Sequence, residues 1–173
     1  MKMLFWFAVT LLITYTASCL LIYWQQERLL FYPTKAPTQL RYSFTHPFTE
    51  LMLPVEGAAI NVVHFTRADA KGVVLYLHGN GDIIARLEPV AAFFLKLGYD
   101  VVIPDYRGYG KSTGTITNEQ DFYADMVTVY QYVQNNYPEN QITLYGQSMG
   151  SGLAAMVAAQ QQPARLILES PYY

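Results

Sequence analysis

The amino-acid sequence predicts an α/β domain, with helices on both faces of a mostly parallel sheet, preceded by one long apolar helix. Short apolar runs such as VVLYL (73–77) and DVVIP (100–104) alternate with longer segments of helical character, which is the pattern of βαβ units. Because VVLYL is apolar without interruption and DVVIP is apolar after Asp100, we expect strands that are covered on both faces. The preceding helix is indicated by residues 3–26, which contain no charged side chain.

The composition excludes several classes of function. The chain has 173 residues, 52% of them apolar and only 14% charged, with a net charge of -2. Such a chain offers no basic field for a nucleic acid, so we expect no nucleic-acid partner. Its one cysteine, Cys19, permits neither an intrachain disulfide nor a cysteine metal cluster. We predict neither a metal site nor a cofactor.

Residues 1–26 are predicted to form a transmembrane anchor, because their apolar run is long enough to cross a bilayer as a helix. A cleaved signal sequence is the alternative, with Lys2 as its basic start and small residues at 16–18. Those small residues precede Cys19 and loosely resemble a lipoprotein processing site. The apolar run continues through 20–24, however, which favours an uncleaved anchor.

The flanks of this segment carry aromatic and basic residues. The aromatic residues resemble the belts found at membrane interfaces: Trp6, Tyr23, Trp24, Phe31 and Tyr32. Lys2 lies on one flank and Arg28, Lys35 and Arg41 lie beyond the other. Basic residues thus stand on both sides, and the side of the membrane on which the domain lies stays open.

The rest of the chain divides into an extended connector, 27–48, which contains three prolines, and a domain, 49–173. The domain begins with strands at 49–54 and 58–66 around a turn at Glu56 and Gly57. The expected helix over 82–97 has Asp82 as N-cap, is split by Pro89 and ends at the C-cap Gly98. The remaining elements are a helix over 117–137 that opens with a capping box at 117–120, a strand over 141–145, a helix over 149–161 and a strand over 164–169.

The strongest motif is GQSMG at 146–150, which has the form G-x-S-x-G between a predicted strand and a predicted helix. In this turn Ser148 is expected to have a strained backbone and an exposed hydroxyl. A Cβ at Gly146 or Gly150 would collide with the neighbouring strand or helix. The N–H of Met149 and the helix dipole would then stabilise an oxyanion. The alternative is an ordinary glycine-rich turn in which Ser148 only caps the helix.

The second motif is HGNG at 78–81, directly after the 73–77 strand. We expect the N–H of Asn80 to point at the same oxyanion, with Gly79 and Gly81 letting the loop approach closely. For His78 we favour a structural role, holding the loop through a side-chain hydrogen bond, over a catalytic one.

The third motif, DYRGYGKS at 105–112, resembles two phosphate-binding patterns and fits neither. A P-loop needs glycine where Asp105 stands, and a dinucleotide fingerprint needs glycine where Thr113 stands. We therefore predict a structural loop whose turn is fixed by Asp105 and Arg107.

Taken together, the runs HGNGD, PDYRGYGKSTG, LYGQSMGSG and LILESPYY resemble the α/β-hydrolase superfamily. More narrowly, they are similar to its membrane-anchored branch of serine aminopeptidase type, which the run QERLLFYPT after the anchor also fits. The resemblance implies a serine hydrolase that cleaves ester, thioester or amide bonds of a small acyl or ester substrate. It also implies Ser148 as the nucleophile, with Asn80 and Met149 as oxyanion donors.

The catalytic acid and base are not apparent in the sequence. In this family the triad runs serine, acid, histidine along the chain, yet His46, His64 and His78 all precede Ser148. Glu169 is a candidate acid, although we favour a structural role for it. We therefore expect an N-terminal fragment of a hydrolase whose acid and base lie beyond it. The alternative is a non-catalytic remnant or a binding scaffold.

Overall fold

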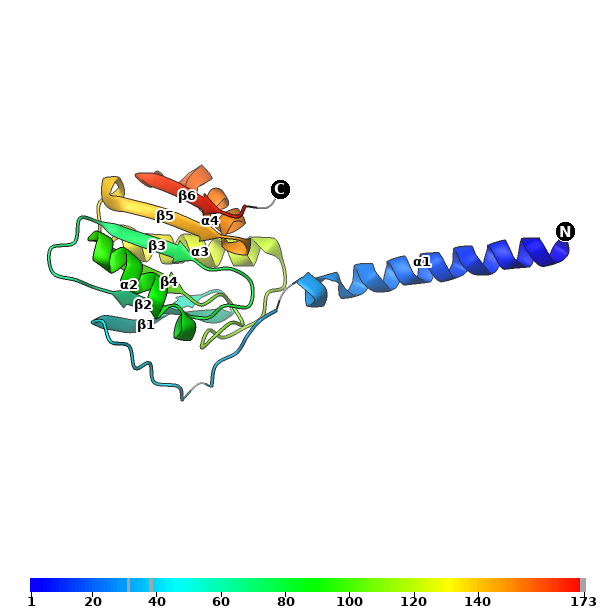
Figure 1. Ribbon diagram of the computed structural model, residues 1–173, viewed down its shortest axis with the longest axis horizontal. Coiled ribbons are helices and arrows are strands. Elements are labelled where there is room, and N and C mark those ends of the chain that lie inside the picture. The colour runs from blue at the N-terminus through cyan, green and yellow to red at the C-terminus, as the bar shows by residue number, and fades with distance from the viewer. Residues whose placement is uncertain (31, 38, 172–173) are drawn as a thin grey trace. The chain divides into compact units, whose positions relative to one another are not determined.

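The computed structural model describes residues 1–30, 32–37 and 39–171, and it divides into two compact units, 1–32 and 33–173. The first unit is α1 (Lys2–Leu30), in which Lys2–Gln26 is long and apolar enough to span a membrane (Figure 1). Its threonines donate their hydroxyls to the carbonyl four residues earlier, as Thr10 does to Trp6 at 2.9 Å. Bonds of this kind satisfy hydroxyl groups on an otherwise apolar helix. Phe31, expected in the aromatic belt, lies outside the described residues.

The second unit contains a six-stranded sheet of order β1-β2-β4-β3-β5-β6. Its strands are β1 (Phe48–Val55), β2 (Ala58–Phe65), β3 (Val73–Leu77), β4 (Asp100–Pro104), β5 (Ile142–Gln147) and β6 (Arg165–Glu169). β1 and β2 form the predicted hairpin, and β2 pairs antiparallel with β4. The pairs β3 with β4, β3 with β5, and β5 with β6 are parallel. The mostly parallel sheet predicted from the sequence is confirmed.

Helices cover both faces of the sheet, as predicted. In Figure 1, α2 (Glu88–Leu97) lies on one face, whereas α3 (Glu119–Gln134) and α4 (Met149–Gln160) lie on the other. The core beneath α2 is built from buried residues of the short helix η1 (Ile84–Arg86), of α2 and of the strands: Val63, Phe65, Val74, Tyr76, Ile84, Leu87, Ala91, Phe94, Leu95, Val101 and Ile103. A second short helix, η2 (Glu139–Gln141), precedes β5.

The expected N-cap at Asp82 is wrong. The helix η1 follows Ile83 and α2 follows Leu87, with Pro89 in the first turn of α2. A proline has no N–H to donate, so it is tolerated in the first turn and breaks a helix that would extend further upstream. The other end agrees with the sequence: Gly98 is the C-cap, with a left-handed φ of 98°.

The capping box expected at 117–120 is also wrong. Asn118 is the N-cap of α3, and its side chain accepts from the N–H of Asp121 at 2.8 Å. The Thr117 hydroxyl instead donates to the Asp121 carboxylate. Thr117 and Asn118 are both good cap residues, and only the contacts distinguish them. The helix also ends at Gln134, earlier than the predicted end at residue 137.

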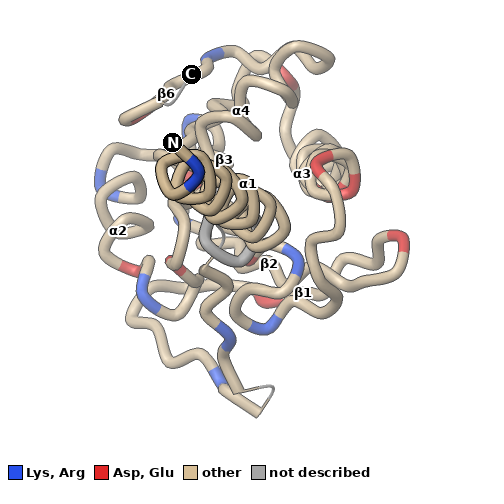
Figure 2. The backbone as a smooth tube through the Cα atoms, turned by 90° about the vertical axis from the view of Figure 1, so that its right-hand side faces the viewer, with Lys and Arg blue, Asp and Glu red and all other residues tan. Residues whose placement is uncertain are grey.

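The edge of the sheet and its centre differ in burial. Every residue of β6, the edge strand of the sheet, is exposed. The central strand is β3, which is fully buried. The next two strands along the chain, β4 and β5, lie on opposite sides of β3. In open α/β sheets, ligands bind at the carboxyl ends of the strands that meet at such a point. Acidic and basic residues are interspersed along the described backbone (Figure 2).

Candidate active site

The GQSMG motif forms the turn between β5 and α4. Ser148 has φ 49° and ψ -117°, and its side chain makes no cap hydrogen bond. A left-handed conformation at a serine costs of order 1–3 kcal/mol and persists only where the surroundings impose it. Because Ser148 is also exposed, the expected strained turn with an accessible hydroxyl is present. The alternative, a serine whose hydroxyl caps the helix, is wrong.

Close backbone approaches impose this turn. A Cβ on Gly146 would lie 2.4 Å from the Gly150 carbonyl oxygen, and a Cβ on Gly150 would lie 2.1 Å from that of Leu77. The N–H of Ser148 donates to Glu169 O at 2.9 Å, and its carbonyl accepts from the N–H of Ser151 at 2.8 Å. The turn is therefore fixed mainly through its backbone, and the Ser151 hydroxyl also donates to the Ser148 carbonyl, at 2.6 Å. Met149 is the first residue of α4, where N–H groups have no partner within the helix.

The HGNG loop lies beside this turn, since a Cβ on Gly79 would be 3.6 Å from Cβ of Ser148. The loop is held from other parts of the chain. Tyr109 donates its hydroxyl to Oδ1 of Asn80 at 2.8 Å, and Thr34 donates its hydroxyl to the Gly81 carbonyl at 2.9 Å. The sequence motifs predicted the loop and not these two partners.

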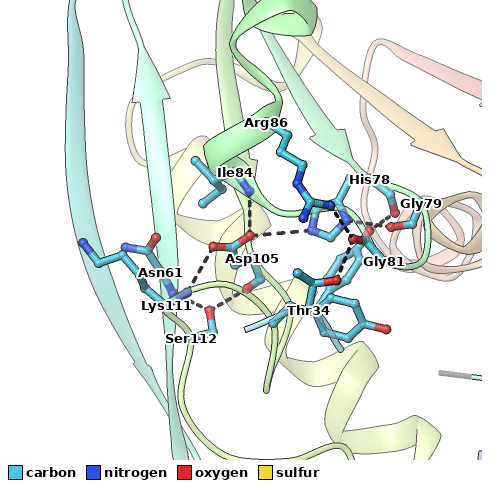
Figure 3. A network of polar contacts seen from close by, with 12 residues as sticks. Thr34, Asn61, His78, Gly79, Gly81, Ile84, Arg86, Asp105, Lys111 and Ser112 are labelled. Atoms are coloured by element: carbon cyan, nitrogen blue, oxygen red, sulfur yellow. Dashed lines mark hydrogen bonds and ion pairs between the residues drawn. The ribbon is translucent and has the colours of Figure 1, made fainter. Parts of the chain in front are cut away.

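His78 is fully buried at the base of the loop. Its Nδ1 lies 2.8 Å from the Gly79 carbonyl oxygen, and Tyr106 donates its hydroxyl to the His78 carbonyl at 2.6 Å. The predicted loop-holding hydrogen bond is present. Burial lowers the pKa of His78 to about 4, so the ring is neutral at pH 7 and Nδ1 carries its proton. Nε2 is buried and lies 3.9 Å from Oδ1 of Asp105 (Figure 3).

Asp105 anchors the loop that follows β4. Its carboxylate accepts from the N–H of Ile84 at 2.8 Å and of Lys111 at 3.3 Å, and from the Tyr42 hydroxyl at 3.4 Å. Burial raises its pKa to about 6. A Cβ on Gly110 would lie 1.7 Å from Oδ2 of Asp105, so the motif requires glycine there.

Arg107 fixes the same loop to α3. Its guanidinium donates to both carboxylate oxygens of Asp125, at 2.8 and 2.7 Å, and both side chains are buried. The predicted structural role of Asp105 and Arg107 is confirmed. The sequence analysis missed Asp125, although an acidic residue on the buried face of a predicted helix is a signal of such a pair.

Glu169, the candidate acid, is held by its neighbours on the sheet. Tyr145 donates to its Oε2 at 2.9 Å, and the Gln147 amide lies 3.4 Å from its Oε1. Gln147 in turn accepts from the Tyr76 hydroxyl at 2.8 Å. These contacts join the side chain before Ser148 to the end of β6.

The three histidines are engaged away from the Ser148 hydroxyl. Nδ1 of His46 lies 3.2 Å from the Glu88 carboxylate, and the ring nitrogens of His64 each lie 3.0 Å from a tyrosine hydroxyl of the α3 region. His78 bonds to its own loop. Among the described residues, no group of three or more His, Cys, Asp or Glu side chains is placed to hold a metal ion.

The model of the serine aminopeptidase S33 family matches residues 68–173, which include all three motifs. The chain belongs to this family of α/β-hydrolases. The family's fold is also found in solved structures. A thermostable carboxyl esterase from Bacillus coagulans matches with 26% identity and a TM-score of 0.63, over 72% of this chain and 44% of that one. An α/β-hydrolase from Vibrio vulnificus matches with 28% identity and a TM-score of 0.63, over 72% and 45%.

Among curated relatives, the lysophosphatidylserine lipase ABHD12 of Danio rerio is 32% identical over 171 residues, covering 82% of this chain and 43% of the lipase. The match supports the membrane-associated branch of the superfamily that the motifs predicted. The chain spans about half or less of the length of the first curated relatives that it matches.

Proposed function

We propose that the protein is a membrane-anchored serine hydrolase that cleaves ester, thioester or amide bonds through an acyl-enzyme on Ser148. The observation that carries the proposal is the strained, exposed Ser148, whose hydroxyl caps nothing and stands at the N-terminus of α4. Strain at a functional residue is retained where the activity needs that geometry. The proposed substrate is a small acyl or ester compound.

In the proposed reaction, Oγ of Ser148 attacks the substrate carbonyl while its proton passes to a histidine base. The negative charge that develops on the carbonyl oxygen is stabilised by the N–H groups of Asn80 and Met149. The bond to the leaving group then breaks, and the leaving group takes the proton. Water attacks the acyl-enzyme in the same way and releases the acid.

We assign the base to none of the three histidines in this chain, because His46, His64 and His78 have partners elsewhere. The family order places acid and histidine after the serine. We accordingly propose that both belong to a part of the full-length protein outside these 173 residues. Glu169 keeps the structural role that its bonds to Tyr145 and Gln147 support.

A fluorophosphonate probe tests the proposal, because it phosphonylates a serine only when base and oxyanion donors activate it. The full-length protein in its membrane fraction should label, and digestion should place the adduct on the peptide that contains Ser148. Ser148→Ala should not label, whereas Ser43→Ala, which changes an exposed serine of the connector, should still label. An unlabelled wild-type protein would favour the non-catalytic scaffold. A panel of simple esters and lysophospholipids would then sort the substrates of a labelled protein.

The anchor is proposed to be the single span Lys2–Gln26. Alkaline carbonate should leave the protein in the membrane pellet, and its intact mass should include residues 1–26. A mass equal to that of a chain that begins at Cys19 and carries an added lipid would instead support the processed form.

A further inference from the structure

Residues 33–36, which we call the strap, follow the apolar helix in sequence and pair with the loop after β4. The N–H of Gly110 donates to Thr34 O at 2.8 Å, and the N–H of Ala36 donates to Gly110 O at 2.9 Å. Lys35 forms an isolated parallel bridge with Gly110. The sequence predicted an extended connector here. The contacts fix it by backbone hydrogen bonds to a residue that must be glycine because of Asp105.

The side chain of Thr34 reaches the other loop of the site. Its Oγ1 donates to the Gly81 carbonyl at 2.9 Å (Figure 3). Gly81 has φ 83°, and a Cβ added to it would meet no described heavy atom within 4 Å. Packing therefore does not hold this turn. Arg86 also approaches the Gly81 carbonyl, at 3.5 Å and in an exposed position, so the bond from Thr34 is the shorter restraint.

The two loops that the strap joins also meet at Asn80. Tyr109 donates to Asn80 Oδ1 at 2.8 Å. Gly110 is the neighbour of Tyr109 in sequence, and Gly81 is the neighbour of Asn80. The strap thus bonds to the residue beside each member of this pair, and a shift of the strap would move both.

We propose that Thr34 is a positioning residue that sets the direction of the Asn80 N–H toward the oxyanion. The proposal rests on the proposed function and goes beyond it, since Thr34 is assigned to act through its bond to the Gly81 carbonyl. Oxyanion stabilisation depends on donors that are already oriented before the reaction, and small displacements of such groups reduce rates steeply. The strap would thereby make the rate of Ser148 depend on the segment that leaves the membrane helix.

The test is the rate at which the fluorophosphonate labels Ser148 in the full-length protein in its membrane. Thr34→Val keeps the shape of the side chain and removes the hydroxyl donor. The second-order rate constant should fall about tenfold, which is less than the loss expected when an oxyanion donor is removed entirely. Thr34→Ser restores the hydroxyl and should lie within about twofold of wild type. With an ester substrate, the loss should appear in kcat and leave KM unchanged, because the ground-state carbonyl needs the donor less than the oxyanion does.

The control is Thr128→Val, which removes a hydroxyl that donates to the Ala124 carbonyl on the exposed side of α3. It should label at the wild-type rate. Equal labelling of Thr34→Val and wild type would overturn the proposal. A Thr34→Val variant that labels slowly would also overturn the proposal if its thermal stability fell too and Thr34→Ser did not restore the labelling rate. If the wild-type protein labels no better than Ser148→Ala, the proposed function itself fails, and the role of the strap fails with it.

Discussion

The two turns that meet at the candidate site are held in different ways. The turn at Ser148 is fixed mainly by backbone contacts, through glycines that admit no Cβ and the bonds of Ser148 N and O, and the Ser151 hydroxyl of the adjoining helix donates to the same Ser148 carbonyl. The loop at 78–81 is fixed by side chains from elsewhere, among them Thr34 and Tyr109. The first turn therefore depends on the glycines of a short motif and on backbone atoms of Leu77 and Glu169. The second depends on segments that are distant in sequence, and its geometry can be tuned without changing the motif.

The largest effect expected from this difference is at Gly150. In Gly150→Ala, the new Cβ would lie 2.1 Å from the carbonyl oxygen of Leu77 and 2.6 Å from its carbonyl carbon. Both are backbone atoms of the central strand and cannot rotate away, so we expect a loss of about 3 kcal/mol or more. Urea unfolding followed by circular dichroism would measure it.

The matched control for Gly150→Ala is Gly81→Ala in the other loop. Gly81 has space for a Cβ and only its φ of 83° opposes one, so the cost should be about 1–2 kcal/mol. Equal stabilities of the two variants would contradict the view that close backbone contacts are the main restraint on the turn at Ser148.

A second prediction concerns the buried pair beneath the loop, His78 and Asp105. The pKa of His78 is lowered from 6.5 to about 4, so its contribution to stability is complete above pH 6.5 and is lost as the pH falls toward 4. The pKa of Asp105 is raised from 3.8 to about 6, so its contribution is complete below pH 3.8 and is lost as the pH rises toward 6. Burial is the main cause of both pKa shifts. Between about pH 4 and 6 the two groups change the stability in opposite directions.

Asp105→Asn should remove the pH dependence of stability that Asp105 causes and leave the pH dependence that His78 causes. Between pH 6.5 and 4 the variant should lose roughly 2 kcal/mol more stability than the wild-type protein does. Urea unfolding at several pH values would measure the difference. Asp69→Asn, at an exposed loop position, is the control and should follow the wild-type curve. Parallel curves for Asp105→Asn and wild type would mean that the two groups do not compensate.

The sequence predicted most of the fold because its signals are local. The run 73–77 is a continuous apolar segment and 100–104 is apolar after Asp100, and both strands have these bounds. Gly98 was predicted as a C-cap from a local signal as well, a glycine at the end of a helical segment. The errors at Asp82 and Thr117 lie at helix starts. Thr117 and Asn118 can each supply the cap and contacts decide between them, whereas the helices after Asp82 begin at Ile84 and Glu88 without a side-chain cap.

The candidate site was predictable to a similar limit. Ser148, Met149, Asn80 and the glycines stand in motifs whose spacing carries the geometry. Thr34 is 47 residues from Gly81 in sequence, and a threonine in a proline-containing connector has no pattern that indicates such a contact. Asp125 carried a weak signal as an acidic residue on a buried helix face. Contacts between residues so far apart leave no periodic pattern in a single sequence.

The smallest effect is expected at the hydroxyl groups that flank the two turns, and it tests the comparison most directly. Tyr109→Phe removes the bond to Asn80, and Tyr145→Phe removes the bond to Glu169 beside the turn at Ser148. Each loss should cost about 1 kcal/mol of stability. Only Tyr109→Phe should also slow fluorophosphonate labelling, by about threefold, because Tyr109 bonds to the oxyanion loop itself, whereas Tyr145 bonds to Glu169 and not to Ser148. Slower labelling of Tyr145→Phe by the same factor would show that side chains position both turns, and the distinction between them would be lost.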